Sequence, residues 1–501
     1  MKTYDTGNRI FSSKDEQAAV YNGLDTLVTR ELKDKLPATD WSAYEHSLLG
    51  PIFHMMQRGL RVDLLERDRL VTEMDKRLAK LHKTLDRFCI AVGSPPINMR
   101  SNPQLLKLFY ETLAVPKQVS VKKGVAKVSL DGDALEKIQK SYIRAIPFCR
   151  LVLRIRNLEK FRDALTKGLS PSGRFKSSYS IAGTDTGRLS SSTHPLRLGG
   201  NGQNLAPEAR RIMVADPGYV LCYTDLQGAE ARAVAFLAGD ENYIKGVESG
   251  DVHTLVASMV WGFEQKRALA DRKFYQDFTY RDLAKRATHG TSYGGQPSTI
   301  ARVLKVERPL IEDFQRKFFK AFPGIKEWQL WTARELQEKG RLTTPFGMTR
   351  TFWGRRWEDT TLREAIAFVP QSTIATVMNL GMLKVWRKYK PPRFQLLANV
   401  HDAILFQIPI AEREELLPQI IEDLKIPVDV TDIHGKIRTL VIPVEAHVGL
   451  NWGDKESVLS FEDGTIKTIG YTEKLHLGDI FHENQKRIVK IETKNPDGMS
   501  K

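Results

Sequence analysis

Cysteine is scarce in this sequence, with three among 501 residues. Cys89, Cys149 and Cys222 lie far apart, and none belongs to a Cys-x-x-Cys pair. This spacing excludes a disulfide framework and a thiolate zinc site, and it suits a reducing compartment. The sequence also lacks an apolar run of about 18 residues, and its polar start does not resemble an export signal. We therefore expect a cytoplasmic protein that makes no membrane contact.

Acidic residues are in deficit, since 60 Asp and Glu stand against 76 Lys and Arg, which leaves a net charge of +16. Such an excess favours a polyanionic partner, because Lys and Arg that neutralise phosphates release condensed counterions. Many basic proteins bind no polyanion, so the charge alone leaves the partner open. With 41% apolar residues and a length of 501, the chain can build ordinary cores in about three domains.

Hydrophobic spacing predicts a mainly helical first third, and the Ser-, Thr- and Gly-rich residues 177–202 predict an ordered loop region. The next segment is expected to be a strand at 219–224 followed directly by a helix, and two apolar strands at 394–400 and 404–408 predict a hairpin. The polar, Lys-rich residues 456–501 indicate a small appended module or a loose tail. The other predicted helices cover residues 15–36, 44–88 with a turn at 59–63, 103–113, 133–138, 142–166, 228–237, 252–259, 275–291, 299–303, 310–322 and 363–383.

Two acids stand at junctions between predicted elements. Asp225 ends the apolar strand just before the next helix, where Asp is also a common helix cap. Asp402 lies in the predicted turn between two apolar strands, where Asp is equally common. On neighbouring strands, two such acids could hold two Mg²⁺ ions about 4 Å apart for an in-line phosphoryl transfer. The 177 residues between them (402 − 225) leave room for an inserted domain.

Between the two acids, one predicted helix carries a polar stripe. Its members recur every fourth residue and so share one side of the helix, namely Arg281, Lys285, His289 and Tyr293. A solvated basic face is the plain alternative. The stripe lacks acidic partners in the sequence and ends in Tyr-Gly-Gly. This favours a nucleoside triphosphate, with its phosphates toward Arg281 and Lys285 and its base toward His289 and Tyr293.

These segments resemble the three polymerase motifs of family A DNA polymerases, in the same order. The first resembles the Asp-Tyr-Ser-Gln-Ile-Glu-Leu-Arg pattern, the second the Arg-x3-Lys-x3-Phe-x3-Tyr-Gly helix, and the third Val-His-Asp-Glu. The agreement extends from about residue 44 to residue 452. The matching positions are Asp225, Glu230 and Arg232, then Arg281, Lys285, Tyr293 and Gly294, then Val400, His401 and Asp402.

The resemblance implies an α+β right-hand polymerase fold, with an antiparallel-sheet palm, helical fingers and a helical thumb. It implies that Asp225 and Asp402 hold two Mg²⁺ ions, with Mn²⁺ as a substitute, and that Glu230 blocks a ribose 2′-hydroxyl. The positively charged side chains of Arg281, Lys285 and His253 would contact the triphosphate. Tyr293 would stack near the template base. The residues implied to contact primer–template DNA are Arg188, Asn204, Arg363, Gln371 and His401.

Three features of the sequence depart from the family pattern, two single residues and one segment near the start. His289 replaces a Phe or Tyr ring that packs on the incoming sugar, so sugar discrimination is in question. Ala403 replaces the Glu after the second catalytic Asp, yet the essential pair remains. Tyr21 and Asp25 resemble the last motif of the 3′→5′ exonuclease without its Asp-x-Glu strand. We therefore expect no self-contained proofreading, unless a separate exonuclease subunit completes the site.

The implied domains follow from these matches. Residues 1–40 are expected to be the end of an exonuclease domain, 41–178 the thumb and connecting helices, 179–263 the first part of the palm, 264–346 the fingers, 347–455 the second part of the palm and 456–501 a tail. We expect a phage-encoded enzyme of DNA replication or repair in the bacterial host cytoplasm, with a processivity subunit as a possible partner. The alternatives are a single-subunit RNA polymerase, against which Glu230 argues, and a non-catalytic DNA-binding relative.

Overall fold

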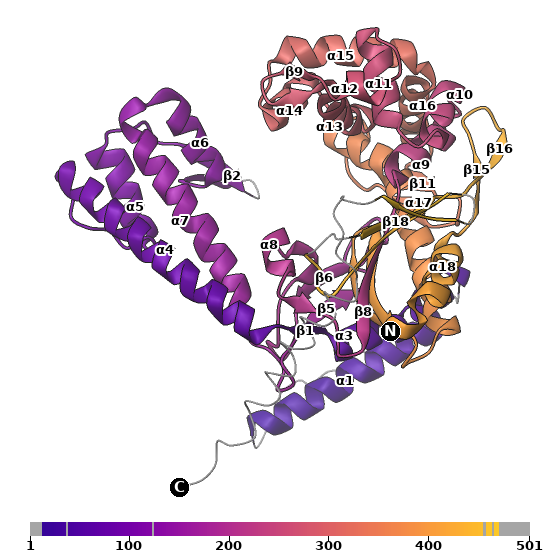
Figure 1. Cartoon of the computed structure of the whole chain (residues 1–501), viewed down its shortest axis with the longest axis horizontal. Coiled ribbons are helices and arrows are strands. Elements are labelled where there is room, and N and C mark those ends of the chain that lie inside the picture. The colour runs from indigo at the N-terminus through magenta and orange to yellow at the C-terminus, as the bar shows by residue number, and fades with distance from the viewer. Residues whose placement is uncertain (1–12, 37–38, 123–124, 454–456, 463–464, 470–501) are drawn as a thin grey trace. The chain divides into compact units, whose positions relative to one another are not determined.

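A computed structural model describes residues 13–36, 39–122, 125–453, 457–462 and 465–469 (Figure 1). The chain divides into two compact units, Met1–Gly50 and Pro51–Lys501. The described part of the first unit holds helices α1 (Lys14–Lys35) and α2 (Asp40–Ser47), and α3 (Leu49–Arg58) spans the junction. The hydroxyl of Ser13 accepts a hydrogen bond from the amide of Glu16 and caps α1, which confirms the predicted helix at 15–36.

The second unit begins with the predicted helical segment. Its two long helices, α4 (Leu64–Ala91) and α7 (Ile146–Leu165), pack side by side (Figure 1) and share a hydrophobic core. The smaller elements at this core are α5 (Asn102–Lys107), a π-helical turn (Leu108–Thr112), α6 (Gly132–Ser141) and a 3₁₀ turn (Ile143–Ala145). A hairpin of β2 (Val119–Lys122) and β3 (Val125–Val128) interrupts them.

The predicted turn at 59–63 is instead a strand, β1 (Leu60–Val62). It pairs with β4 (Arg174–Phe175) and β7 (Met213–Val214), neither of which is a sequence neighbour. Gly59 has φ +66°, and a Cβ there would lie 2.7 Å from the carbonyl oxygen of Phe175. Glycine is therefore required both for the backbone conformation and for the close approach of β4.

Asp225 and Asp402 belong to a six-stranded antiparallel sheet, Asp225 in a strand and Asp402 in a turn between two strands. The strand order is β13-β14-β8-β17-β18-β19. Its strands are β8 (Tyr219–Leu226), β13 (Gln395–Val400), β14 (Ala403–Pro409), β17 (Val444–Gly449), β18 (Ser457–Glu462) and β19 (Thr465–Ile469). Strand β13 is buried along its whole length, including its polar side chains, Gln395 and Asn399. The predicted hairpin is confirmed as β13 and β14, with His401 and Asp402 as its two turn residues.

Two predicted irregular regions contain strands. Residues 177–202 include a hairpin of β5 (Ser177–Ser180) and β6 (Ser190–Thr193), whose serine-rich sequence carries little strand signal. The buried hydroxyl of Ser177 donates to the carbonyl oxygen of Gly200 at 2.8 Å, so contacts outside the hairpin hold it in place. Residues 457–469 of the expected tail add β18 and β19 to the sheet, whereas 470–501 lie outside the described residues.

Helices dominate the stretch between β8 and β13, as predicted (Figure 1). Helix α13 begins at Tyr280 rather than at 275, because residues 273–279 form the hairpin of β9 (Lys273–Tyr275) and β10 (Phe278–Thr279). Helix α16, which starts with Pro323, was not expected. The helices of this stretch are α9 (Ala229–Ala238), α10 (Glu241–Glu248), α11 (Val252–Trp261), α12 (Arg267–Ala270), α13 (Tyr280–Ser292), α14 (Pro297–Leu304), α15 (Arg308–Ala321), α16 (Pro323–Lys339) and α17 (Asp359–Lys388). Helix α8 (Pro207–Arg210) precedes β8, and α18 (Arg413–Leu424) follows the sheet hairpin.

Helix α17 is the one helix among the described residues that is long and apolar enough to cross a membrane. Its most apolar window is 83% buried within the protein, which is the behaviour of a core helix. Two further hairpins complete the fold, β11 (Arg341–Thr343) with β12 (Thr349–Thr351) and β15 (Val428–Thr431) with β16 (Ile437–Leu440).

Candidate functional site

Asp225 and Asp402 come together at the ends of adjacent strands. Asp225 lies within β8, directly opposite Ala403 of β14, and Asp402 is the neighbour of Ala403 in the turn. The amide of Leu226 donates to the carbonyl oxygen of Asp402 at 3.2 Å, which fixes the turn against β8. Helix α9 starts after Gly228, whose position has no side-chain cap, so Asp225 is a strand residue and not a helix cap.

The charges at this strand end repel each other. Burial, the carboxylate of Asp402 and that of Glu445 raise the pKa of Asp225 to about 6. Burial also raises the pKa of Asp402, against the opposing charge of Arg188. Glu445 lies opposite Asp225 on the other neighbouring strand, β17, and the sequence analysis did not identify it. Its signal in the sequence is one acid in an alternating strand, which becomes informative only when the strand pairing is known.

A divalent cation fits the donor atoms of this pair. Oδ1 of Asp402 is buried without a hydrogen bond, although Nη2 of Arg188 lies 3.1 Å away, and Oδ2 accepts a hydrogen bond from that atom at 3.2 Å. No group of three or more His, Cys, Asp or Glu side chains forms a metal cluster in the part of the chain that the structure describes. Mg²⁺ is characteristically held by one or two carboxylates with water and substrate oxygens, so two acids suffice for it.

A chain of ion pairs connects these acids to α13. Arg188, in the loop between β5 and β6, contacts Asp402 at 3.1 Å and Glu230 of α9 at 3.3 Å. Glu230 in turn lies 2.7 Å from Nδ1 of His289 on α13. Burial raises the pKa of Glu230, but the hydrogen bond from His289 and the charges of His289 and Arg188 outweigh it and lower the pKa overall. The hydrogen bond with Glu230 raises the pKa of His289 despite its partial burial.

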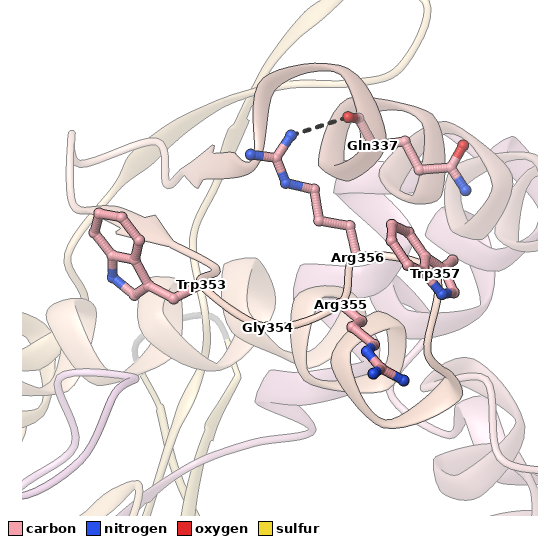
Figure 2. A pocket seen from close by; sticks show the side chains of 6 residues that line it. All are labelled: Gln337, Trp353, Gly354, Arg355, Arg356 and Trp357. Carbon is pink, nitrogen blue, oxygen red and sulfur yellow. Dashed lines mark hydrogen bonds between the residues drawn. The ribbon is translucent and has the colours of Figure 1, made fainter.

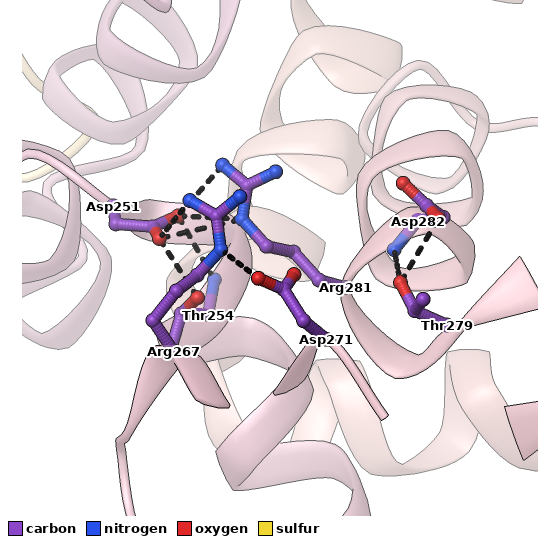
Figure 3. Close-up of polar contacts among 7 residues, drawn as sticks. All are labelled: Asp251, Thr254, Arg267, Asp271, Thr279, Arg281 and Asp282. Atoms are coloured by element: carbon purple, nitrogen blue, oxygen red, sulfur yellow. Dashed lines mark hydrogen bonds and ion pairs between the residues drawn. The ribbon is translucent and has the colours of Figure 1, made fainter. Parts of the chain in front are cut away.

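The stripe on α13 has acidic partners in the fold, which corrects the expectation that it has none. Arg281 makes three hydrogen bonds of 3.0–3.3 Å to the carboxylate of Asp251, which also caps α11. Figure 3 shows the guanidinium groups of Arg281 and Arg267 beside each other, both turned to this carboxylate, and Arg267 lies 3.4 Å away. Lys285 is exposed and makes no ion pair with any residue in the described ranges. The acid that holds Arg281 is 30 residues away, beyond the reach of a helix-spacing argument.

His253 does not carry the positive charge that the family pattern implied. Burial, together with the nearby cations Arg281 and Lys285, lowers its pKa to about 4. Its Nδ1 is buried without a hydrogen-bond partner among the described residues. The imidazole is therefore neutral near pH 7 and can donate a hydrogen bond rather than a charge.

Tyr293 ends the stripe beside the ion-pair chain. Its ring lies 5.3 Å from that of His289 in an edge-on arrangement, and burial raises the pKa of its hydroxyl. Gly294 follows with φ +70°, and a Cβ there would lie 3.2 Å from Ile366 and 3.9 Å from Arg363 on α17. Because Gly294 has no side chain, the end of α13 can pack closely against the start of α17.

The residues implied to contact DNA surround this centre without forming one cluster. His401 is exposed in the hairpin turn with φ +57°, and Asn204 is exposed at the end of a 3₁₀ turn, Gly202–Asn204. Arg363 and Gln371 are partly buried on α17, about two helical turns apart. Gln203, to which the sequence assigned no role of its own, is buried and donates to the backbone carbonyl of Leu189 at 2.9 Å. It holds the loop that carries Arg188.

Comparison with known proteins gives a consistent assignment. Residues 66–454 match the family model for DNA polymerase family A. The thermostable DNA polymerase I of Thermus filiformis is 29% identical over 422 residues, which cover 81% of this chain and 47% of the relative. DNA polymerase I of Chloroflexus aurantiacus is 29% identical over 467 residues, which cover 88% of this chain and 47% of the relative. The chain spans about half the length of the curated relatives it matches.

A solved structure agrees with these relatives. The polymerase domain of Pol1 from M. smegmatis, in complex with DNA primer-template and dNTP, is similar with a TM-score of 0.67 and 23% identity. The similarity covers 82% of this chain and 70% of that one. At this identity the similarity establishes the fold alone, and it confirms the predicted α+β right-hand polymerase architecture.

Proposed function

This chain belongs to DNA polymerase family A, and we propose that it adds deoxynucleotides to a primer 3′-hydroxyl on a DNA template. One observation carries the proposal. The ion-pair chain from Asp402 through Arg188 and Glu230 to His289 joins the acids of the sheet to the basic stripe of α13. The acids that would hold metal ions are thus linked to the helix that would hold the triphosphate, and this link supports a phosphoryl-transfer role.

Asp225 and Asp402 would hold two Mg²⁺ ions, or Mn²⁺ as a substitute. When bound, such ions activate the attacking hydroxyl and stabilise charge on the leaving oxygen. The raised pKa values support this role, because both carboxylates are buried and the charges of Asp402 and Glu445 repel that of Asp225, so a nearby cation would stabilise the ionised acids. Glu445 would add negative charge at the strand end without being a ligand.

The nucleotide would lie along α13. Arg281 and Lys285 would pair with the triphosphate, which requires Arg281 to exchange the carboxylate of Asp251 for phosphate. Neutral His253 would donate a hydrogen bond to the same group. Glu230, held from both sides by Arg188 and His289, is a rigid obstacle at the position where a ribose 2′-hydroxyl would lie. Tyr293 would stack near the template base.

The DNA contacts and domains are proposed on the same basis. Arg188, Asn204, Arg363, Gln371 and His401 would contact primer–template DNA. We assign residues 179–263 and 347–455 to the palm, 264–346 to the fingers and 41–178 to the thumb. Four strands of the sheet, β8, β13, β14 and β17, fall within the palm bounds, and the long helices α4 and α7 fall within the thumb bounds, which supports this division, whereas β18 and β19 extend the sheet beyond residue 455.

Primer extension tests the proposal directly. The purified chain is incubated with a primed template, Mg²⁺ and deoxynucleotides, beside Asp225→Ala as the inactive variant and Asp429→Asn as a control acid on β15. Loss of extension in Asp225→Ala alone supports the proposal. Unchanged extension by Asp225→Ala would show that the metal assignment is wrong, and no extension by the parent chain would favour a non-catalytic DNA-binding relative.

The nearest rival is a single-subunit RNA polymerase. The carboxylate of Glu230 favours deoxynucleotides, because a 2′-hydroxyl would meet a side chain that Arg188 and His289 hold in place. Extension with ribonucleotides and deoxynucleotides in parallel separates the two, and equal use of both would contradict our choice. Phage origin, action in a host cytoplasm, the absence of proofreading and partnership with an exonuclease or processivity subunit stay predictions.

A further inference from the structure

Two tryptophans stand out on the surface between β12 and α17. Trp353 is 91% exposed and Trp357 is 75% exposed. Their neighbour Phe352 is 5% exposed and anchors the segment in the core, so the rings project from a fixed base. Exposed rings of this size cost hydrophobic free energy and commonly mark a binding surface.

The two rings line an open hollow of about 560 Å³ together with Gln337, Gly354, Arg355 and Arg356. Figure 2 shows the rings on opposite sides of the Arg356 side chain, which reaches toward α16. Nη1 of Arg356 donates to the carbonyl oxygen of Gln337 at 3.2 Å. Gly340, with φ +65°, leaves the space that this guanidinium occupies, because a Cβ there would clash with it. Arg356 is therefore positioned by the backbone of α16.

The charges that line the hollow indicate which kind of ligand it would bind. The lining contains two guanidinium groups and no carboxylate. Glu358 lies 3.5 Å from Arg355, but both side chains are largely exposed, so the pair is weak and leaves the guanidinium available. Rings that alternate with cations are the arrangement that binds unpaired nucleotides, since bases stack on the rings and phosphates meet the cations.

The hollow also lies close to the proposed template site. Helix α17 begins two residues after Trp357, and Arg363 and Ile366 in its first turns pack against Gly294, the neighbour of Tyr293. Arg363 lies four residues into this helix, about 6 Å along its axis from Asp359. The start of α17 therefore joins the segment that carries the hollow to the end of α13, where Tyr293 lies.

We propose that Trp353 and Trp357, with Arg355 and Arg356, form a binding site for unpaired nucleotides of a single DNA strand. Under the proposed function this strand is the template ahead of the base being copied, so the identity of the strand rests on that function. The stacking site itself does not depend on catalysis. A protein partner would also use exposed rings, but it would not require cations between them.

The test compares a blunt duplex with the same duplex carrying an unpaired 5′ template extension of about eight nucleotides. Binding is followed by fluorescence anisotropy without nucleotides or metal, so that catalysis does not contribute. We expect the parent chain to bind the extended duplex about tenfold more tightly. The double variant Trp353→Ala/Trp357→Ala should lose this preference, and the double Phe variant should keep most of it.

Trp331→Ala is the matched control, because Trp331 is 36% exposed on α16 but does not line the hollow. Circular dichroism establishes that each variant is folded. If the double Ala variant keeps the parent preference for the extension, the inference is overturned, and the rings are left for a protein partner. A parent chain that extends no primer but keeps the preference would contradict the proposed function while supporting this site.

Discussion

Two regions of the proposed site differ in how their charges are balanced. One is the strand end with Asp225 and Asp402, and the other is the face of α13 with Arg281 and His289. At the strand end, acidic groups accumulate: burial raises the pKa values of both acids, and the charges of Asp402 and Glu445 raise that of Asp225 further. On α13, protein carboxylates compensate the cations, since Asp251 holds Arg281 and Glu230 holds His289. At the strand end, Arg188 is a counterion of Asp402 and not of Asp225, whereas on α13 both Arg281 and His289 have a carboxylate partner.

This difference in charge balance indicates how each region would bind its ligand. A cation that enters the strand end gains interaction free energy with both acids, although it competes with Arg188, which lies 3.1 Å from Asp402. The α13 face must exchange one anion for another, so its net gain is the difference between triphosphate and carboxylate. We expect substitutions at the strand end to abolish the reaction and substitutions on α13 to change mainly nucleotide affinity.

The largest expected effect is on the acids. Asp225→Ala and Asp402→Ala should each lower the primer-extension rate at saturating nucleotide by about a thousandfold or more, because metal-assisted charge stabilisation is lost. Single-turnover extension with Asp429→Asn as the control measures this. Retention of more than about a tenth of the rate would remove the proposed difference between the two regions.

Arg281→Ala should raise the KM for deoxynucleotides by about tenfold to a hundredfold with a smaller change in kcat, because one charged hydrogen-bonding group is lost. Asp251→Asn is the matched partner, since Asn still caps α11 but no longer competes for Arg281. It should lower the KM by about threefold. A KM that rises in Asp251→Asn would mean that Asp251 positions Arg281 rather than competes with phosphate.

Stability should show the repulsion at the strand end. The pKa of Asp225 is raised from 3.8 to about 6, so the folded state binds its proton more tightly than the unfolded state does. Folding stability therefore decreases as pH rises between about 4 and 6 and stays lower above that range. Asp225→Asn should be more stable than the parent by on the order of 1–3 kcal/mol near pH 8 and about equal near pH 4.

Melting temperatures with EDTA present, at both pH values, measure this difference. Asp429→Asn is again the control, because its carboxylate is exposed on β15 and hydrogen-bonds Thr439. Equal melting of Asp225→Asn and parent near pH 8 would indicate that the repulsion is neutralised in another way.

The smallest expected effect concerns the pair between His289 and Glu230. Because the pKa of His289 is raised, the ion pair is complete below the ordinary histidine value and is lost as pH rises through the raised value. Histidine NMR titration should give a pKa above 6.5 in the parent and a lower one in Glu230→Gln. Identical titration in both proteins would mean that the contact does not persist in solution.

Strong local patterns made the elements predictable. The apolar runs flanking His401 and Asp402 predicted the hairpin of β13 and β14, and spacing of four predicted one shared face on α13. The serine-rich hairpin of β5 and β6 and strand β1 were missed, because their pairing depends on residues distant in the sequence. Local propensity carries no information about such partners.

The sequence by itself determined the α+β architecture, the family and the residue types at the proposed centre, because these follow from periodicity and from motifs in a definite order. Only the tertiary structure decided which charges meet. It placed Glu445 opposite Asp225, showed that Asp225 is a strand residue and not a helix cap, paired Arg281 with Asp251 and lowered the pKa of His253 by burial. Charge interactions depend on distance and burial in space, and neither is encoded in the spacing of residues along the chain.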